Sequence, residues 1–441
     1  MATNNLASAD TSPADPLAPA RREELVRAVA AGDISLHKLP PELSAREAAA
    51  VRREGLERAA NTQTKGLDSF AFNADQASSS NCENLIGAAH VPIGVVGPLP
   101  VHGDRVNESL YVPLATTEGA LIASVNRGCA ALRQAGGATV HVEDVGLTRA
   151  PVFRTSGIRA SKRFVQWLEN HEDEIRTRVE ATSRYLSLLD LRPFTVGTTV
   201  FVRFRFSTGD AMGMNMATLA CDKVIQDLIV PETGVEFVSL SGNYCVDKKP
   251  AAINAQEGRG KRIYAEAELD AHDVEEGLKT TAADLIETQY RKNLLGSSAA
   301  GSMSMNAHYA NMVAAFFVAT GQDIAQVVEG ALGTTCIEPR GDNGIYVSIY
   351  MPDVPLGAVG GGTGLQTQQD VLSLLGVELD PNEPGAAVMR LAEILGATVL
   401  AGELSLMGAL SSHHLARAHH QLGRPNLPSS NGQSVVSDAT S

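Results

Sequence analysis

Apolar side chains recur at helical spacing along much of the chain. The clearest run spans residues 120–132, and the Thr-Thr-Glu segment that begins at Thr116 predicts a helix with Glu118 in its first turn. The same spacing predicts further helices over residues 21–31, 42–60, 211–230, 271–292, 305–328 and 384–420. The chain is therefore rich in helices that bury one face.

Residues 151–240 have a different pattern. A charge-rich helix is predicted over 161–189, and a β-rich alternation over 195–206 precedes the helix at 211–230. These elements predict a small α+β domain inserted at 151–238, and a further strand is predicted over 344–351. The other predicted parts are a disordered tail at 1–21, a helical region at 22–82, a large domain at 83–150 and 251–421, a connecting loop at 239–250 and a mobile tail at 422–441.

Composition indicates a globular protein of two or three domains. The chain has 441 residues, of which 44% are hydrophobic and 20% charged. Its five cysteines are scattered without C-x-x-C spacing, which argues against disulfides and a zinc site and favours a reducing cytosol. We expect no signal peptide and no membrane span. A net charge of −14 disfavours nonspecific binding to nucleic acid or an anionic membrane.

Four separated stretches carry residues suited to carbonyl reduction. They place Glu118 in Ala-Thr-Thr-Glu-Gly, Lys248 in Asp-Lys-Lys-Pro, Asp323 in Gly-Gln-Asp and His419 in His-Leu-x-x-x-His. In such a reaction acids deliver protons and a cation stabilises an oxyanion. A nearby carboxylate adjusts the pKa of the acid and of the cation. Each residue alone also has an ordinary interpretation: the Glu near a helix dipole, the Lys in solvent, the Asp at a helix end and the His on a surface.

The segment that begins at Asp210, Asp-Ala-Met-Gly-Met-Asn-Met, has two interpretations. It can be a capped helix start with methionine packing, or a glycine at a helix N-terminus that receives a pyrophosphate. The G-x-G-x-x-G fingerprint of doubly wound nucleotide domains is missing from the sequence. The glycine run at 360–362 permits close approach of a ligand, although such runs are usually turns.

Together with their surroundings, these stretches resemble the hydroxymethylglutaryl-coenzyme A reductase family over residues 83–419. The resemblance implies an α+β fold: a large, mainly helical substrate domain around a long central helix, with an inserted ferredoxin-like domain that binds the nucleotide. It implies reduction of hydroxymethylglutaryl-CoA to mevalonate and coenzyme A by two NADPH, through mevaldyl-CoA and mevaldehyde. The form of the motifs is similar to the biosynthetic (class I) branch.

The resemblance also assigns roles to individual residues. Glu118 donates a proton to the aldehyde, Lys248 stabilises the oxyanion, Asp323 tunes both, and His419 protonates the departing thiolate. The implied cofactor contacts are Ser183, Arg184, Asp210, Met212, Gly213, Met214, Asn215, Gly361 and Gly362. The implied substrate contacts are Ser124, Asn126, Arg127, Arg149, Ser241, Asp247, Lys249, Lys292 and Asn311. No metal is implied, and Arg184 favours NADPH over NADH because a guanidinium suits a phosphate.

The resemblance further implies a homodimer or a tetramer of dimers, in which one subunit presents the nucleotide domain and the other presents Glu118, Lys248 and Asp323. The segment at 83–87 is similar to the family's subunit contact. Two alternatives remain open: an NAD-dependent enzyme that oxidises mevalonate, and a catalytically silent coenzyme A-binding protein. Arg424 and Pro425 stand where animal members carry a phosphorylated serine, so we expect no kinase control there.

Overall fold

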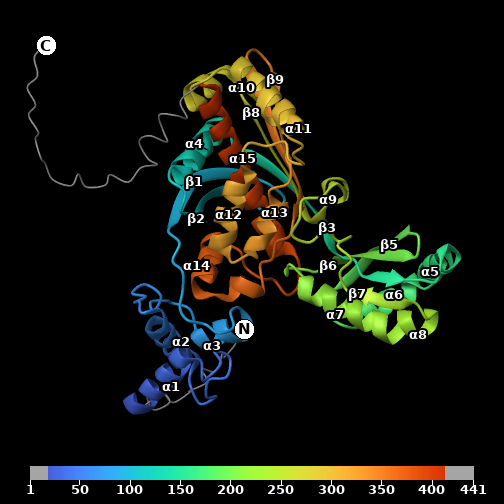
Figure 1. The fold of residues 1–441 in the computed structure, drawn as a ribbon. Coiled ribbons are helices and arrows are strands. Elements are labelled where there is room, and N and C mark those ends of the chain that lie inside the picture. The colour runs from blue at the N-terminus through green and yellow to red at the C-terminus, as the bar shows by residue number, and fades with distance from the viewer. Residues whose placement is uncertain (1–17, 413–441) are drawn as a thin grey trace, which may run out of the picture.

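The computed structural model describes residues 18–412, which form three parts (Figure 1). An N-terminal helical region lies at one end of a large domain, and a smaller domain extends from the other side. The N-terminal region contains α1 (Pro19–Ala31), α2 (Ala45–Ala60) and α3 (Ala74–Ser80). At the start of α2, Ser44 and Glu47 exchange hydrogen bonds in a capping box, which fixes where this helix begins.

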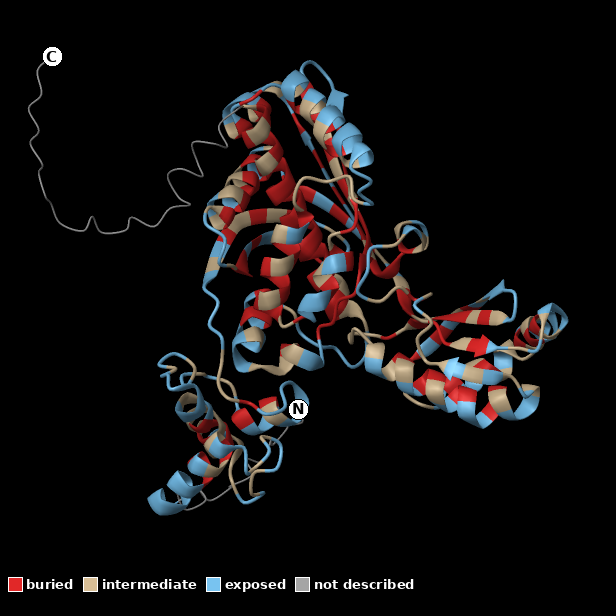
Figure 2. Ribbon diagram, in the orientation of Figure 1, coloured by how far each residue is buried: buried red, intermediate tan, exposed pale blue. Residues whose placement is uncertain are grey.

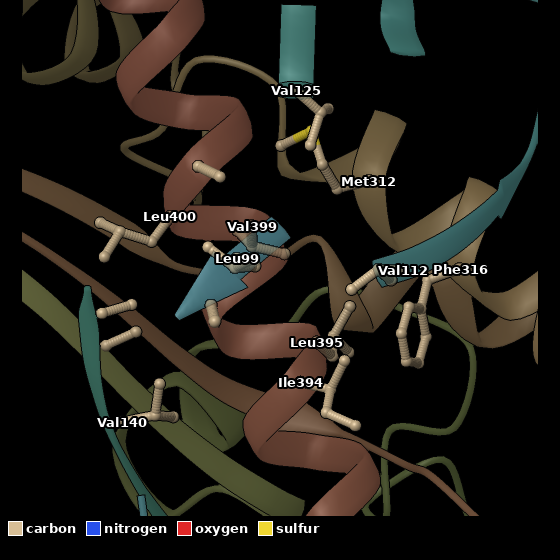
Figure 3. Close-up of a cluster of buried hydrophobic side chains, with 14 of the residues drawn as sticks. Leu99, Val112, Val125, Val140, Met312, Phe316, Ile394, Leu395, Val399 and Leu400 are labelled. Carbon is tan, nitrogen blue, oxygen red and sulfur yellow. The ribbon is translucent and has the colours of Figure 1, made fainter. Parts of the chain in front are cut away.

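The large domain is built around one long helix, α15 (Ala386–Ser411). Almost every residue of α15 is buried, because α4 (Leu121–Gln134), α12 (Tyr309–Thr320) and the sheet pack around it. Figure 3 shows its side chains Ile394, Leu395, Val399 and Leu400 among apolar residues of these neighbours. Within residues 18–412, α15 is the one helix long and apolar enough to cross a membrane, yet 89% of that apolar window is buried inside the domain.

Six strands of the large domain pair in the order β2-β1-β3-β8-β10-β9. All neighbours are antiparallel except β1 with β3. The strands are β1 (Ile93–His102), β2 (Asn107–Ala115), β3 (Ala138–Arg149), β8 (Arg259–Leu269), β9 (Thr334–Arg340) and β10 (Gly344–Val354). Burial alternates along β8, so one face of the sheet packs on α15 and the other is more exposed.

Several predicted helices are divided in the structure. The helix expected over 271–292 breaks at Lys279, whose left-handed φ of 57° ends the first part, and the helix expected over 305–328 ends at Gly321, with a φ of 74°. The short helices of this domain are α9 (Ala252–Glu257), η2 (Asp273–Leu278), α10 (Ala282–Thr288), η3 (Gln289–Gly296), α11 (Ser297–Ala299), η4 (Ile324–Gln326), α13 (Val327–Gly330), η5 (Gly361–Gly364) and α14 (Gln366–Leu374).

The small domain has the β-α-β-β-α-β element order of a ferredoxin-like fold. Its antiparallel strands pair in the order β7-β4-β6-β5. The elements are β4 (Val152–Arg154), α5 (Ile158–Asn170), α6 (Glu172–Glu180), β5 (Ser187–Val196), β6 (Thr199–Ser207), α7 (Met214–Val224), η1 (Ile225–Ile229), α8 (Val230–Thr233) and β7 (Glu236–Ser239). The predicted helix over 161–189 is thus two helices followed by a strand.

The small domain has its own core, which contains Phe153, Phe164, Phe204 and Phe206. This cluster is separate from the one around α15, and Figure 2 shows buried residues inside both domains. The last residues of β3 pair with β6, so the sheet of the large domain continues into the small one. Each domain therefore folds around its own core while the two share backbone hydrogen bonds.

The contact between α4 and α15 generates a stability prediction. A Cβ added at Gly128 would lie 1.8 Å from the carbonyl oxygen of Ala401. We expect Gly128→Ala to destabilise the protein by about 1–3 kcal/mol or more, because the two helices must move apart. Thermal and urea denaturation would measure this loss. The control is Gly66→Ala, where an added Cβ meets nothing within 4 Å. Equal stability of the two variants would contradict the described packing.

Candidate active site

The connecting loop between the two domains has an unusual backbone. Three of its non-glycine residues adopt left-handed conformations: Asn243 (φ 60°), Val246 (φ 51°) and Lys248 (φ 59°). This region is sparsely populated, and for a β-branched residue such as valine it is a true outlier. Each such residue costs about 1–3 kcal/mol and persists only where its surroundings impose it. The loop therefore depends on contacts from outside itself.

Those contacts come from buried side chains of both domains. Arg203 donates from Nη1 to the carbonyl oxygen of Tyr244 at 2.9 Å, and the hydroxyl of Thr148 donates to the carbonyl of Cys245 at 3.1 Å. Both donors are almost completely buried. A bond between two buried groups cannot be replaced by water without cost, so these contacts hold the loop firmly.

Within the described residues, Lys248 points from this loop to Asp323. Its Nζ lies 2.8 Å from Asp323 Oδ2. The hydrogen bond to Asp323 is the main cause that raises the pKa of Lys248, and partial burial opposes it. Asp323 is itself fixed, because its Oδ1 accepts from the backbone N–H of Ala325 at 3.1 Å. The predicted pairing of these two residues is present, and it keeps the lysine cationic.

Asp247, the neighbour of Lys248, belongs to a network around Arg259. The Arg259 side chain is fully buried and forms ion pairs with Glu329 and, at 2.9 Å, with Asp247. Gln326 Nε2 donates to the same Asp247 oxygen at 3.1 Å. The resemblance implied that Asp247 contacts the substrate, but in this structure its Oδ1 already has two partners within the chain.

Two carboxyl groups of this network are deeply buried. Burial raises the pKa of Glu329 to about 8 and the pKa of Asp353 to about 7, and Arg259 opposes both shifts. Asp353 Oδ2 accepts from Asn254 Nδ2 at 2.6 Å. One oxygen of each carboxyl has no hydrogen-bond partner within residues 18–412. Burial therefore disfavours the charged form of both carboxyl groups, and Arg259 offsets this cost by pairing with Glu329.

Lys248 and Asp323 line a cavity of about 660 Å³ between the two domains. The cavity also collects most of the predicted cofactor contacts, which are Met212, Gly213, Met214, Asn215, Gly361 and Gly362. Arg149 lines it as well, and its Nε is buried without a hydrogen-bond partner among the described residues. An unpaired buried guanidinium nitrogen is costly unless an anion or another acceptor satisfies it.

The Asp-Ala-Met-Gly-Met-Asn segment forms the start of α7. Gly213 is the N-cap residue, with a φ of 93°, and an added Cβ there would lie 2.2 Å from Thr208 Cγ2. Only glycine fits this position. Asp210 has a different role: its carboxylate accepts from the backbone N–H groups of Gly385 and Val388 at 2.9 and 3.0 Å. It thereby caps α15 and ties the small domain to the central helix.

A smaller cavity of about 240 Å³ adjoins the first and shares Ala211, Met216 and Val359 with it. Tyr185 lines the small cavity, and the guanidinium of Arg184 stacks over the Tyr185 ring. Ser183 donates to the sulfur of Met216 at 3.6 Å. Ser183 and Arg184, two of the implied cofactor contacts, therefore lie next to the α7 segment.

Two glycine segments pack against each other at the edge of the larger cavity. A Cβ added at Gly321 would lie 2.5 Å from backbone atoms of Gly362, and one added at Gly362 would lie 2.7 Å from the carbonyl oxygen of Gly321. Gly360 and Gly361 have open space beside them. This contact places the glycine run of 360–362 beside the turn that carries Asp323.

Glu118 does not line the cavity at Lys248. It precedes α4 by three residues rather than lying in its first turn, because Ala120 is left-handed (φ 72°) and the helix begins at Leu121. Its backbone N–H donates to Thr116 Oγ1 at 3.0 Å, and its Oε1 accepts from Asn311 Nδ2 at 3.2 Å. Glu118 is thus held by the first turn of α12.

The sequence analysis missed His308, which fixes Asn311. His308 Nε2 lies 2.9 Å from the carbonyl oxygen of Gly402, so this nitrogen carries the proton and Nδ1 is an acceptor. Asn311 Nδ2 lies 3.2 Å from that Nδ1. The Asn311 amide must therefore present its N–H groups to both His308 and Glu118. No motif in the sequence marks His308, because it stands apart from the other histidines and its contact with Gly402 joins residues far apart in the chain.

Four other implied substrate contacts have partners inside the large domain and do not line the cavity around Lys248. Lys292 is half-buried, which lowers its pKa, and its Nζ donates to Asn293 Oδ1 at 3.0 Å. Ser124 and Arg127 bond to Ser405 of α15, at 3.0 Å and 3.1 Å, and Asn126 accepts from the Gly97 N–H at 3.0 Å.

The predicted site therefore falls into two halves within one chain. Asn311, which holds Glu118, lies in the first turn of α12, whereas Asp323 follows the last residue of this helix. About 14 Å of helix separates Asn311 from Thr320 at a rise of about 1.5 Å per residue. The structure joins Lys248 to Asp323 but not to Glu118. His419 lies outside the described residues.

Ser241 and Lys249 stay within the connecting loop. The Ser241 hydroxyl lies 3.7 Å from Cys245 Sγ, and Lys249 Nζ donates to the Asp247 carbonyl at 3.2 Å. A third cavity, of about 580 Å³, opens in the small domain beside Arg154 and Trp167. It contains none of the predicted site residues, so we assign the candidate site to the cavity at Lys248.

Comparison with known proteins identifies the family of this chain. The family model for hydroxymethylglutaryl-coenzyme A reductase matches residues 48–424. The 3-hydroxy-3-methylglutaryl-coenzyme A reductase of Methanothermobacter thermautotrophicus is 48% identical over 395 residues, which cover 89% of this chain and 98% of that protein. The enzyme of the same name from Halobacterium salinarum is 47% identical over 406 residues, which cover 92% and 100%.

A solved structure adds a likeness of fold. The class II 3-hydroxy-3-methylglutaryl-CoA reductase of Streptococcus pneumoniae, bound to NADPH in open conformations, aligns with a TM-score of 0.62 at 17% identity. The alignment covers 88% of this chain and 96% of that one. Since the family model matches most of the sequence and relatives of nearly half identity cover most of both chains, this protein belongs to the hydroxymethylglutaryl-coenzyme A reductase family.

Proposed function

We propose that this protein reduces hydroxymethylglutaryl-CoA to mevalonate and coenzyme A with two NADPH, as a biosynthetic enzyme of the mevalonate pathway. The observation that carries the proposal is the Lys248–Asp323 pair, at 2.8 Å, on a cavity that also contains the start of α7. A fixed cation beside a nucleotide-binding segment is the arrangement that reduction of a thioester needs. Membership of the reductase family supports the same reaction.

The residues around the cavity fit a nicotinamide dinucleotide. Gly213 and the first turn of α7 suit a pyrophosphate, and the open glycine positions 360 and 361 permit close approach of the backbone. The smaller cavity beside Tyr185 suits an aromatic base, and Arg184 next to it suits a phosphate on the ribose. NADPH bound there supplies the hydride for both reductions.

Lys248 acts in the first reduction. Its cationic Nζ holds the thioester oxygen while negative charge develops on it, which stabilises the transition state. Hydride addition at that carbon gives the hemithioacetal mevaldyl-CoA, and its C–S bond then breaks to give mevaldehyde and the coenzyme A thiolate. Asp323 keeps Lys248 in place and protonated. Arg149, with its unpaired Nε, suits the carboxylate of the acyl chain.

Two acids complete the reaction. His419 protonates the departing thiolate, and Glu118 donates a proton to the aldehyde oxygen when the second hydride is added. The sum is one hydroxymethylglutaryl-CoA, two NADPH and two protons converted to mevalonate, coenzyme A and two NADP⁺. Asn311 orients Glu118, since one of its N–H groups donates to Oε1 and leaves Oε2 as the oxygen that can carry the proton.

We propose that two chains complete each site. Glu118 and Lys248 lie at opposite ends of α12 within one chain, so neither can reach a carbonyl held by the other. In a homodimer, one chain contributes the nucleotide segment with Lys248 and Asp323, and its partner contributes Glu118. This division revises the expectation that Glu118, Lys248 and Asp323 come from the same subunit.

A cytoplasmic location fits this proposal. All five cysteines, from Cys82 to Cys336, are free thiols, which suits a reducing compartment. The mevalonate-oxidising alternative differs in its cofactor, because it would use NAD. The stacked Arg184 beside the smaller cavity favours the phosphorylated cofactor.

The assay that tests the proposal combines the purified protein with hydroxymethylglutaryl-CoA and either NADPH or NADH. We expect two NADPH oxidised per coenzyme A thiol released, and slower turnover with NADH. Lys248→Met, which removes the cation but keeps most of the side-chain volume, should show no turnover. Faster oxidation of NADH would favour the catabolic alternative, and tight binding of coenzyme A without turnover would favour the silent homologue.

The pairing of Lys248 with Asp323 generates a prediction on pKa. Asp323→Asn removes the carboxylate that raises the pKa of Lys248, so the pKa should fall and the amine should lose its proton at a lower pH. NMR titration of ¹³C-methylated lysines, with Lys248→Arg to assign the signal, measures this shift. Asp342→Asn, at an exposed turn, should leave the pKa of Lys248 unchanged. An unshifted signal in Asp323→Asn would disprove the pairing.

A further inference from the structure

Three polar side chains of one helical segment face the connecting loop. Asp323, Gln326 and Glu329 follow one another at three-residue spacing across η4 and α13, which places them on one side of the segment. Asp323 binds Lys248 Nζ, and Gln326 donates to Asp247 Oδ1 at 3.1 Å. Glu329 pairs with Arg259, which holds the same Asp247 oxygen at 2.9 Å. Two of these contacts reach successive residues of the loop directly, and Glu329 reaches Asp247 through Arg259.

The three side chains differ in their access to the cavity. Asp323 and Gln326 both line the cavity, but Asp323 is partly exposed whereas Gln326 is 1% exposed, and Glu329 is fully buried. Glu329 does not line the cavity, and its only ion pair within the described residues is with Arg259. A substrate cannot reach Glu329. Its contribution to the reaction must therefore act through the residues that it holds.

Strained backbone flanks the Asp247 carboxylate that these contacts hold. Val246 and Lys248, on either side of Asp247, both have left-handed backbones. Without restraint, a valine and a lysine would return to the extended or right-handed regions that L-residues prefer. That return would rotate the Lys248 side chain away from Asp323. Fixing the Asp247 carboxylate from two directions opposes this rotation.

We propose that Gln326 and Glu329 are positioning residues for Lys248: with Arg259 they clamp Asp247, and so they keep the Lys248 ammonium at Asp323 and in the cavity. This inference rests on the proposed function for the role of Lys248. It extends that function by assigning a purpose to two buried polar residues, of which Gln326 lies at the wall of the cavity and Glu329 lies behind it.

The test uses substitutions that preserve volume. Gln326→Met and Glu329→Met remove the hydrogen-bonding groups and keep similar side-chain volumes, and Glu329→Gln keeps an acceptor for Arg259. Thr398→Val is the control, because it removes one buried hydrogen bond of α15, from Thr398 Oγ1 to the Ile394 carbonyl at 2.7 Å, away from the loop. Gln326→Met is the decisive variant, since it leaves every buried charge in place and is the most certain to fold.

Two readouts apply to the full-length protein. In the NADPH assay, kcat of Gln326→Met and Glu329→Met should fall at least about tenfold while KM for NADPH changes less than about twofold, because misplacing a catalytic group by about 1 Å has effects of this size. Glu329→Gln should retain most of the activity, and Thr398→Val should retain all of it. Equal kcat for wild type and Gln326→Met would overturn the proposal.

The second readout needs no substrate. Trypsin cleaves after Lys248 but not between Lys249 and Pro250, so the rate of cleavage at Lys248 reports how firmly the loop is held. We expect faster cleavage there in Gln326→Met and Glu329→Met, but not in Thr398→Val. Unchanged cleavage would overturn the clamp. If the wild type did not reduce hydroxymethylglutaryl-CoA, the proposed function would fail while this readout still tested the clamp.

Discussion

A single buried guanidinium, that of Arg259, joins the first residue of β8 to the connecting loop and to α13. Removing a charge of this kind from water costs several kcal/mol, and only close, complete pairing offsets it. The two ion pairs therefore fix the positions of Arg259, Asp247 and Glu329 together. Because β8 lies in the middle of the large sheet, the position of Lys248 is set from the most rigid part of the molecule.

The second constraint is the length of α12. Its first turn carries Asn311, which holds Glu118, and Asp323 follows its end. A packed helix cannot shorten, so a single chain cannot bring Glu118 to Lys248. Asp210 adds a related restraint, since it caps α15 from the small domain and limits how far this domain can move at that point. Assembly of two chains is then the simplest way to complete the chemistry.

The periodicity of apolar residues predicted the helices that became α4, α12 and α15, because each buries apolar side chains in the core. It missed β1, whose glycines and prolines at 94, 97, 98 and 100 interrupt any alternation. The resemblance singled out Lys248 and Asp323, and the structure places their side chains in contact. It did not reveal Gln326 or Glu329, because their three-residue spacing is that of any helix and their partners lie far away in sequence.

The central claim is that each site needs residues from two chains, and mixed dimers test it most directly. Glu118→Gln and Lys248→Met chains, each inactive alone, would be co-expressed with different tags, and the mixed dimer would be isolated. If Glu118 of one chain serves Lys248 of the other, one of the two sites in the mixed dimer is intact, and activity should return to about half that of wild type. A mixed dimer without activity would contradict the account.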